Sequence, residues 1–174
     1  VDMTKCLSKY YYENVLCNQN KTAKPNVVWV ADITMLKLFR NQKAYVFLCI
    51  DIHTNIIVAS NISKKTITTH QITKILEKAI EKRFQILPVK KLIINTDRGT
   101  QFFSKTYNNF TENYKNYFLP SMARENTPTD NAVAERFMRT FKEHSINGKT
   151  LQEFIFDELK LYGEVKSYRK VINK

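Results

Sequence analysis

Two apolar runs, each associated with an aspartate, limit what this chain can fold into more than any other feature. Asp32 lies within the run 27–34, and Asp97 directly follows the run 92–96. Runs of this kind are typical of strands covered on both faces, where an ion without partners costs several kcal/mol. Each aspartate therefore either accepts hydrogen bonds from backbone amides, pairs with a lysine, or binds a cation.

A third acid follows on a predicted helix. Residues 128–130 form a helix-start signal with Asp130 as the cap, and the segment that follows is rich in helix formers. At about 100° per residue, Glu135 shares its side of this helix with Arg139 and Lys142. The opposite, apolar side contains Val133, Ala134, Phe137, Met138 and Phe141. The Glu135 side is either a solvated face with a Glu135–Arg139 ion pair or a face that meets nucleic acid.

The order and approximate spacing of Asp32, Asp97 and Glu135 match a two-metal phosphoryl-transfer site. Carboxylates at the ends of neighbouring buried strands can share divalent cations, which neutralise them. A pair of cations about 4 Å apart clamps the attacking and leaving oxygens of a phosphodiester. The three acids are therefore candidate metal ligands and candidate catalytic residues.

Four separated blocks of the sequence resemble a known family. They are residues 24–34, 95–102, 121–124 and 130–137, and they occur in the family's order. Together they resemble the DDE-type integrase catalytic core of bacterial insertion-sequence transposases, which are relatives of retroviral integrases. The resemblance implies an α/β fold of the RNase H-like type, with a central mixed five-stranded sheet flanked by helices. It also implies that the protein cleaves DNA and transfers the cut strand.

The same resemblance implies a set of functional residues and partners. It places the family's three catalytic acids at Asp32, Asp97 and Glu135, as ligands of two Mg²⁺ or Mn²⁺ ions. We expect DNA as the partner, both element ends and target, with a homo-oligomer assembled on it and no small-molecule cofactor. The side chains expected to contact DNA are Arg124, Asn131, Arg136, Arg139 and Lys142.

Net charge agrees with a nucleic-acid partner. The chain has 28 Lys and Arg against 16 Asp and Glu, and the resulting net charge of +12 attracts polyphosphate. The same charge would suit a solvated surface, and an excess of lysine over arginine is also typical of proteins from AT-rich genomes. Charge alone therefore does not decide between a DNA-binding face and a basic surface.

Length and composition predict one domain. A chain of 174 residues with 43% hydrophobic residues can bury one sizeable core. Because it has no apolar stretch of about 18 residues and no signal-peptide pattern, we do not expect a membrane protein. The resemblance implies a cytoplasmic, prokaryote-type protein that acts at the nucleoid. The three cysteines have no disulfide or zinc-site spacing, so we expect reduced thiols.

Hydrophobic periodicity and turn residues predict the order of elements. Three strands and a long helix precede the strand that ends at Asp97, and a helix, a short strand and the Glu135 helix follow it. Asp51 is interpreted as a turn acid and not as a fourth ligand. The family resemblance implies that residues 1–25 are a linker after an absent helix-turn-helix region and that residues 26–174 are the core. The predicted bounds are 27–36, 43–51, 55–62 and 66–84, with a further helical segment over 149–170.

Two other functions stay open from the sequence. A ribonuclease H-type nuclease would share the fold, but it would take an acid from the first long helix, where only Glu77 and Glu81 are present. A catalytically inactive, truncated transposase remnant that only binds DNA would keep the same three acids. We interpret Glu77 and Glu81 as exposed partners of nearby lysines, which are Lys74, Lys78 and Lys82.

Overall fold

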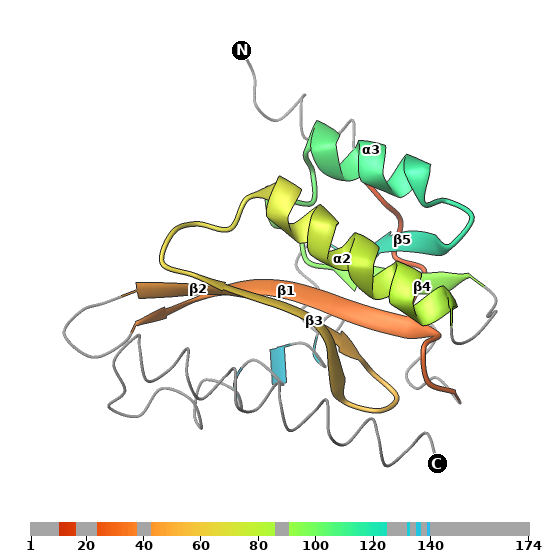
Figure 1. The fold of residues 1–174 in the computed structure, drawn as a ribbon, viewed down its shortest axis with the longest axis horizontal. Helices are drawn as coiled ribbons and strands as arrows, with labels where there is room; N and C mark the ends of the chain where they lie inside the picture. The colour runs from red at the N-terminus through yellow and green to blue at the C-terminus, as the bar shows by residue number, and fades with distance from the viewer. Residues whose placement is uncertain are drawn as a thin grey trace.

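A five-stranded sheet forms the centre of the structure. The computed structural model describes residues 11–16, 24–37, 43–85 and 91–124, and the helical positions Ala132, Glu135, Arg136 and Arg139. The strand order is β3-β2-β1-β4-β5, so β1 occupies the middle of the sheet (Figure 1). In chain order, the strands are β1 (Val28–Lys37), β2 (Lys43–Asp51), β3 (Ile56–Ser63), β4 (Leu92–Thr96) and β5 (Phe118–Met122).

The sheet is mixed. β1 pairs antiparallel with β2 and β2 with β3, whereas β1–β4 and β4–β5 are parallel pairs. Parallel neighbours need a crossover, and the crossovers contain the helices α2 (Thr69–Phe84) and α3 (Lys105–Asn113). Both helices lie on one side of the sheet (Figure 1). The expected mixed five-stranded sheet is confirmed, and its first three strands lie within one residue of their predicted bounds.

α2 forms because apolar side chains recur along one of its faces. Ile72, Leu76 and Ile80 are fully buried there. A capping box fixes the start of the helix: the Thr68 hydroxyl accepts from Gln71 N–H at 3.4 Å, and Gln71 Oε1 accepts from Thr68 N–H at 2.9 Å. The helix begins three residues later than predicted because this capping box, and not the apolar pattern, sets its first turn.

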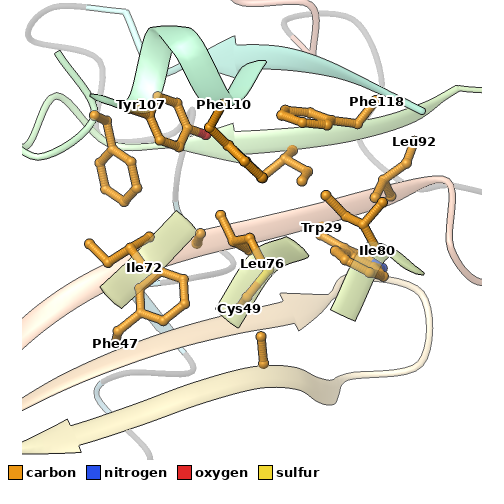
Figure 2. Close-up of a cluster of buried hydrophobic side chains, with 14 of the residues drawn as sticks. Trp29, Phe47, Cys49, Ile72, Leu76, Ile80, Leu92, Tyr107, Phe110 and Phe118 are labelled. Carbon is orange, nitrogen blue, oxygen red and sulfur yellow. The ribbon is translucent and has the colours of Figure 1, made fainter. Parts of the chain in front are cut away.

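α2 and α3 cover a large apolar cluster on one face of the sheet. In Figure 2 the side chains of α2 lie beside those of β1 and β2, and the rings of α3 lie beside β5. The Phe110 and Phe118 rings are 5.4 Å apart, and the Phe102 and Tyr107 rings 5.2 Å. The labelled members are Trp29, Phe47, Cys49, Ile72, Leu76, Ile80, Leu92, Tyr107, Phe110 and Phe118.

The other face of the sheet is also buried. Side chains of β1 and β2 alternate between the faces, and those that point away from α2 and α3 form a second cluster. This agrees with the prediction that β1 is a central strand covered on both faces. The second cluster consists of Val30, Leu36, Ala44, Val46, Leu48 and Ile50.

Cys49 is a free, buried thiol of the large cluster. Burial raises the pKa of this thiol, and the nearby negative charge of Asp51 raises it further. Cys49 is therefore protonated and packs as a small apolar side chain. Cys6 and Cys17 lie outside the described residues. No helix in the described ranges is long and apolar enough to cross a membrane.

β5 is an edge strand with a proline at its centre. Ala123 N–H donates to Thr96 O on β4 at 3.0 Å, so alternation along the strand points the nitrogens of Phe118 and Pro120 away from β4. Phe118 N–H donates to Tyr114 O at 3.1 Å. Pro120 has no N–H to donate, and it is tolerated because its nitrogen faces the open side of the sheet.

Candidate functional site

Asp32 and Asp97 follow paired residues on neighbouring parallel strands. Ala31 of β1 is paired with Thr96 of β4, and the next residue along each strand is one of the two aspartates. Neighbouring strands lie about 4.8 Å apart, and paired residues point to the same face. The register therefore places the two aspartates next to each other at the C-terminal end of β4.

Asp32 stands on the face of β1 that α2 and α3 do not cover. Val30 and Leu36 point to the same side and belong to the second apolar cluster. The Asp32 side chain is half-buried, and its Oδ1 accepts from Ile33 N–H at 2.7 Å. It is less buried than the apolar run predicted because it lies at the level where the neighbouring strand, β4, ends.

The Asp97 carboxylate is held in the turn after β4. Gly99 N–H donates to Asp97 Oδ1 at 3.0 Å, and no other hydrogen-bond or ion-pair partner of Asp97 lies among the described residues. Burial raises the pKa of Asp97, and the Gly99 amide lowers it by less. A Cβ at position 99 would lie 3.0 Å from the same Oδ1, so glycine permits this close approach. A desolvated carboxylate in this setting favours a cation as its partner.

Glu135 is an exposed residue on a helix, as predicted. The helical positions around it, coloured cyan in Figure 1, lie on the side of the sheet away from α2 and α3, which is also the Asp32 side. Within the described part of the chain, no three Asp, Glu, His or Cys side chains gather as a metal site. In the structure, Asp32 and Asp97 thus each follow the last paired residues of β1 and β4, but the described residues do not form a three-ligand cluster with Glu135.

The expected DNA-contacting residues fall into two places. Arg124 is exposed and lies two residues beyond β5, at the same C-terminal end of the parallel strands as Asp97. Arg136 and Arg139 are exposed on the helix of Glu135. The other predictions for this region lie outside the described residues, and they concern Asn131, Lys142, the Asp130 cap and the segment 149–170.

Asp51 serves the fold, as the turn-acid interpretation predicted. It is 1% exposed, and its Oδ1 accepts from His53 N–H at 2.9 Å and from Thr54 N–H at 3.0 Å. Its Oδ2 accepts from Asn26 N–H at 2.5 Å and lies 3.8 Å from the Arg83 guanidinium. Backbone amides at the start of β1 and in the β2–β3 turn therefore share this carboxylate.

The interpretation of Glu77 and Glu81 as lysine partners is wrong. The Tyr114 hydroxyl donates to Glu77 Oε1 at 2.6 Å and lies 3.1 Å from Glu81 Oε1, and neither acid pairs with a lysine within the described ranges. Thr69 at the start of α2 donates to Gln101 O at 3.2 Å. Glu77 lies about 12 Å further along the helix, so α2 directs neither acid to the aspartate pair.

Comparison with known proteins assigns the chain to a family. The family model described as the integrase core domain matches residues 22–128, which is more than half of the chain. The chain belongs to the integrase core domain family. The matched region contains Asp32 and Asp97, and it ends before Glu135.

Two curated relatives of this integrase core domain chain are named as transposases. The putative transposase InsK for insertion sequence element IS150 of Escherichia coli K12 is 27% identical over 153 residues, which cover 88% of this chain and 49% of the relative. The transposase for insertion sequence element IS904 of Lactococcus lactis is 29% identical over 127 residues, covering 73% and 47%. The chain spans about half the length of these relatives.

Solved structures share the fold of this integrase core domain chain. The Mos1 transposase catalytic domain, solved with raltegravir and Mg, has a TM-score of 0.60 at 10% identity, over 81% of this chain and 71% of that chain. A chain of the simian T-cell lymphotropic virus intasome has a TM-score of 0.55 at 18% identity, over 78% and 48%. The expected RNase H-like fold is confirmed, because integrase and transposase catalytic cores have it.

The donor set at the sheet edge suits a hard cation. Asp32 and Asp97 offer carboxylate oxygens, which are the ligands that Mg²⁺ and Mn²⁺ prefer. Sequence reasoning missed two features beside them. One is Gly99 as an amide donor, and the other is Arg98, whose guanidinium carbon lies 5.3 Å from the Tyr11 ring centroid. Neither feature follows from periodicity, because one depends on a loop conformation and the other on a contact between distant segments.

Proposed function

We propose that this chain is the catalytic core of a DNA transposase that cleaves DNA and transfers the cut strand. The observation that supports this most is the register that sets Asp32 beside Asp97 at one sheet edge of an integrase core domain. Both curated relatives are named as transposases of insertion sequence elements. Two aspartates that directly follow paired residues of β1 and β4 suit phosphoryl transfer better than a structural ion pair, because Asp97 has no cationic partner among the described residues.

Asp32 and Asp97 are the proposed metal ligands, with Glu135 as the third. The Gly99 amide orients Asp97 through Oδ1, so we assign Oδ2 to the cation. Burial raises the pKa of Asp97 because its charged form is poorly solvated. A cation next to the carboxylate would therefore stabilise the charged form more than it would stabilise an exposed carboxylate. When bound, two Mg²⁺ or Mn²⁺ ions would activate the attacking oxygen and stabilise the leaving oxygen. A related fold, the Mos1 catalytic domain, was solved with Mg.

Glu135 completes the ligand set by an approach of its helix to the sheet edge. The described positions of this helix lie on the Asp32 side of the sheet, and Glu135, Arg136 and Arg139 are exposed there. Closure would bring a carboxylate and two positive charges to the aspartate pair together. Negative phosphates and the cations would both favour that movement, because they interact more strongly with the closed arrangement than with the open one.

DNA is the proposed partner, and copies of the chain are proposed to assemble on it in the bacterial cytoplasm. Arg124, Arg136 and Arg139 are exposed and can neutralise phosphates. Asn131 and Lys142 belong to the same proposed DNA-binding set, although they lie outside the described residues. Phosphate contacts of this kind position a strand without reading its sequence.

Strand cleavage and metal binding test the proposal together. Asp32→Asn, Asp97→Asn and Glu135→Gln should each reduce Mn²⁺-dependent nicking of plasmid DNA to the background rate. Mn²⁺ should raise the melting temperature of the unaltered protein, and the two aspartate variants should lose that rise. Glu112→Gln is the matched control, because Glu112 is an exposed acid that pairs with Lys115 at 3.8 Å. It should nick DNA and respond to Mn²⁺ as the unaltered protein does.

Three outcomes would contradict the proposal. An aspartate variant that still nicks DNA would remove that residue from the mechanism. Cutting confined to the RNA strand of an RNA–DNA hybrid would support the ribonuclease H-type alternative. DNA binding without metal-dependent nicking in any variant or in the unaltered protein would identify an inactive remnant.

A further inference from the structure

Residues 11–16, which precede the sheet, dock on the core. The Tyr12 hydroxyl donates to Asn108 Oδ1 on α3 at 3.0 Å. Val15 N–H donates to Ser121 Oγ on β5 at 3.0 Å. In Figure 1 this segment, coloured red, runs beside α3 and β5. The segment thus touches two elements that surround the Asp97 turn.

A chain of hydrogen bonds connects the docked segment to β4. Ser121 Oγ, which accepts from Val15, donates in turn to Asn95 Oδ1 at 2.9 Å, and both side chains are buried. Asn95 lies two residues before Asp97. The family match begins at residue 22, so residues 11–16 lie outside the region that the family model matches.

The first described residue of the segment stacks on Arg98. The Arg98 guanidinium carbon lies 5.3 Å from the Tyr11 ring centroid and 5.9 Å from the Phe103 ring centroid. Such cation–π contacts restrict the position of the guanidinium group. An aromatic ring takes up none of the N–H groups with which a guanidinium binds phosphate in bidentate fashion. Stacking therefore orders Arg98 in a way that suits phosphate recognition.

Arg98 and Arg124 follow the C-terminal ends of the neighbouring parallel strands β4 and β5. Thr96 of β4 is paired with Met122 of β5, so the residues two positions beyond each are these two arginines. Both are exposed, and Arg98 directly follows Asp97. Two guanidinium groups beside a carboxylate pair match the charge of a phosphodiester whose scissile bond lies at the carboxylates.

We propose that Arg98, oriented by Tyr11 and Phe103, binds a phosphate of the DNA strand that reaches the Asp32–Asp97 edge. The inference rests on the proposed function. It makes residues 11–16 part of the DNA-binding site and not a passive linker. Because stacking already orders the Arg98 side chain, binding loses less side-chain entropy than it would with a freely moving arginine. The competing explanation is that the stack only fastens the segment to the core.

Salt dependence of DNA binding tests the Arg98 contact. Binding of the full chain to a duplex of about 30 base pairs is measured across salt in EDTA, so that no strand is cut. Arg98→Gln should lower the slope of log affinity against log salt by about 0.9. Lys82→Gln removes the same charge about 20 Å along α2 from its start and should leave the slope unchanged. An Arg98→Gln slope equal to that of the unaltered protein would overturn the proposal.

A double-mutant cycle separates phosphate binding from fastening. Tyr11→Ala removes the ring, and Tyr11→Phe keeps it. Tyr11→Ala should weaken DNA binding several-fold with Arg98 present and have no effect in the Arg98→Gln background. Tyr11→Phe should bind as the unaltered protein does. Equal losses from Tyr11→Ala in both backgrounds would show that the ring acts only by fastening the segment.

These experiments can overturn the phosphate-contact proposal and the proposed strand transfer separately. A chain that shows the Arg98 effect in EDTA but never nicks DNA would overturn the proposed strand transfer and leave the phosphate contact in place. A chain that nicks DNA with an unchanged Arg98→Gln slope would do the reverse. Circular dichroism melts of each variant show that the compared proteins are folded.

Discussion

The Asp97 carboxylate is partly buried, and among the described residues its hydrogen-bond partner is one backbone amide, that of Gly99. Asp51 is fully buried, yet three backbone amides donate to it. The two residues show how different environments assign different roles to the same side chain. Asp51 is satisfied by the fold alone, whereas Asp97 has capacity for a ligand.

Asp97→Asn should stabilise the protein at neutral pH. A folded-state pKa above 3.8 means that the native state binds its proton more tightly than the unfolded state does. Stability from this group is therefore full below pH 3.8 and is lost as pH rises through the raised pKa. The asparagine keeps the Oδ1 acceptor without the charge, so its melting temperature should exceed that of the unaltered protein at pH 7, and the gain should vanish in acid.

Thermal melts of both proteins in metal-free buffer, at a series of pH values, check this prediction. Glu112→Gln, at an exposed position, is the control and should show no such trend. A stability gain that does not change with pH, or an Asp97→Asn protein that melts lower at every pH, would show that the negative charge of Asp97 does not destabilise the folded protein.

The positions of single residues could be predicted from the sequence where they depend on one strand alone. Asp32 and Asp97 stand out because an acid in or beside an apolar strand needs an explanation, and the register confirms that they are neighbours. The Gly99 amide and the Tyr11–Arg98 stack were not predictable, because each depends on how a loop folds back onto the core. The metal-ligand role of Glu135 stays a prediction.

Elements followed the sequence closely wherever one face of a strand or helix is apolar. β1, β2 and β3 were placed within one residue of their bounds and α2 within three, since burial of a periodic pattern leaves few alternatives. Contacts between elements were not predicted. The Tyr114 hydroxyl that ties α3 to Glu77 and Glu81 of α2 joins residues 37 and 33 positions apart, and local patterns carry no information about such distances.

The β2–β3 turn depends on Asp51. Asp51→Ala leaves the amides of Asn26, His53 and Thr54 without their acceptor and should lower the free energy of unfolding by about 3 kcal/mol or more. Asp51→Asn keeps one acceptor oxygen and should cost less. Urea unfolding followed by circular dichroism measures both. Losses below about 0.5 kcal/mol in both variants would mean that water replaces the carboxylate at these amides.

As a whole molecule, the chain should bind DNA with little sequence preference. Its net charge of +12 attracts any duplex, and the exposed side chains of Arg124 and Arg139 are predicted to contact phosphates, which are the same in every sequence. Affinities for unrelated duplexes should agree within about threefold, and Arg139→Ala should lower the salt slope by about 0.9. Titrations across salt provide both numbers. Strong selection of one duplex would mean that this chain itself reads bases.

The proline at the centre of β5 has a consequence for self-association. Of the nitrogens that face the open side of this strand, that of Phe118 donates to Tyr114, that of Pro120 has no hydrogen, and only that of Met122 remains. A sixth strand from another copy would find a poor template there, since main-chain bonds are what hold added strands. In the proposed assembly on DNA, copies would therefore contact each other through side chains at this border, which resists growth into fibres.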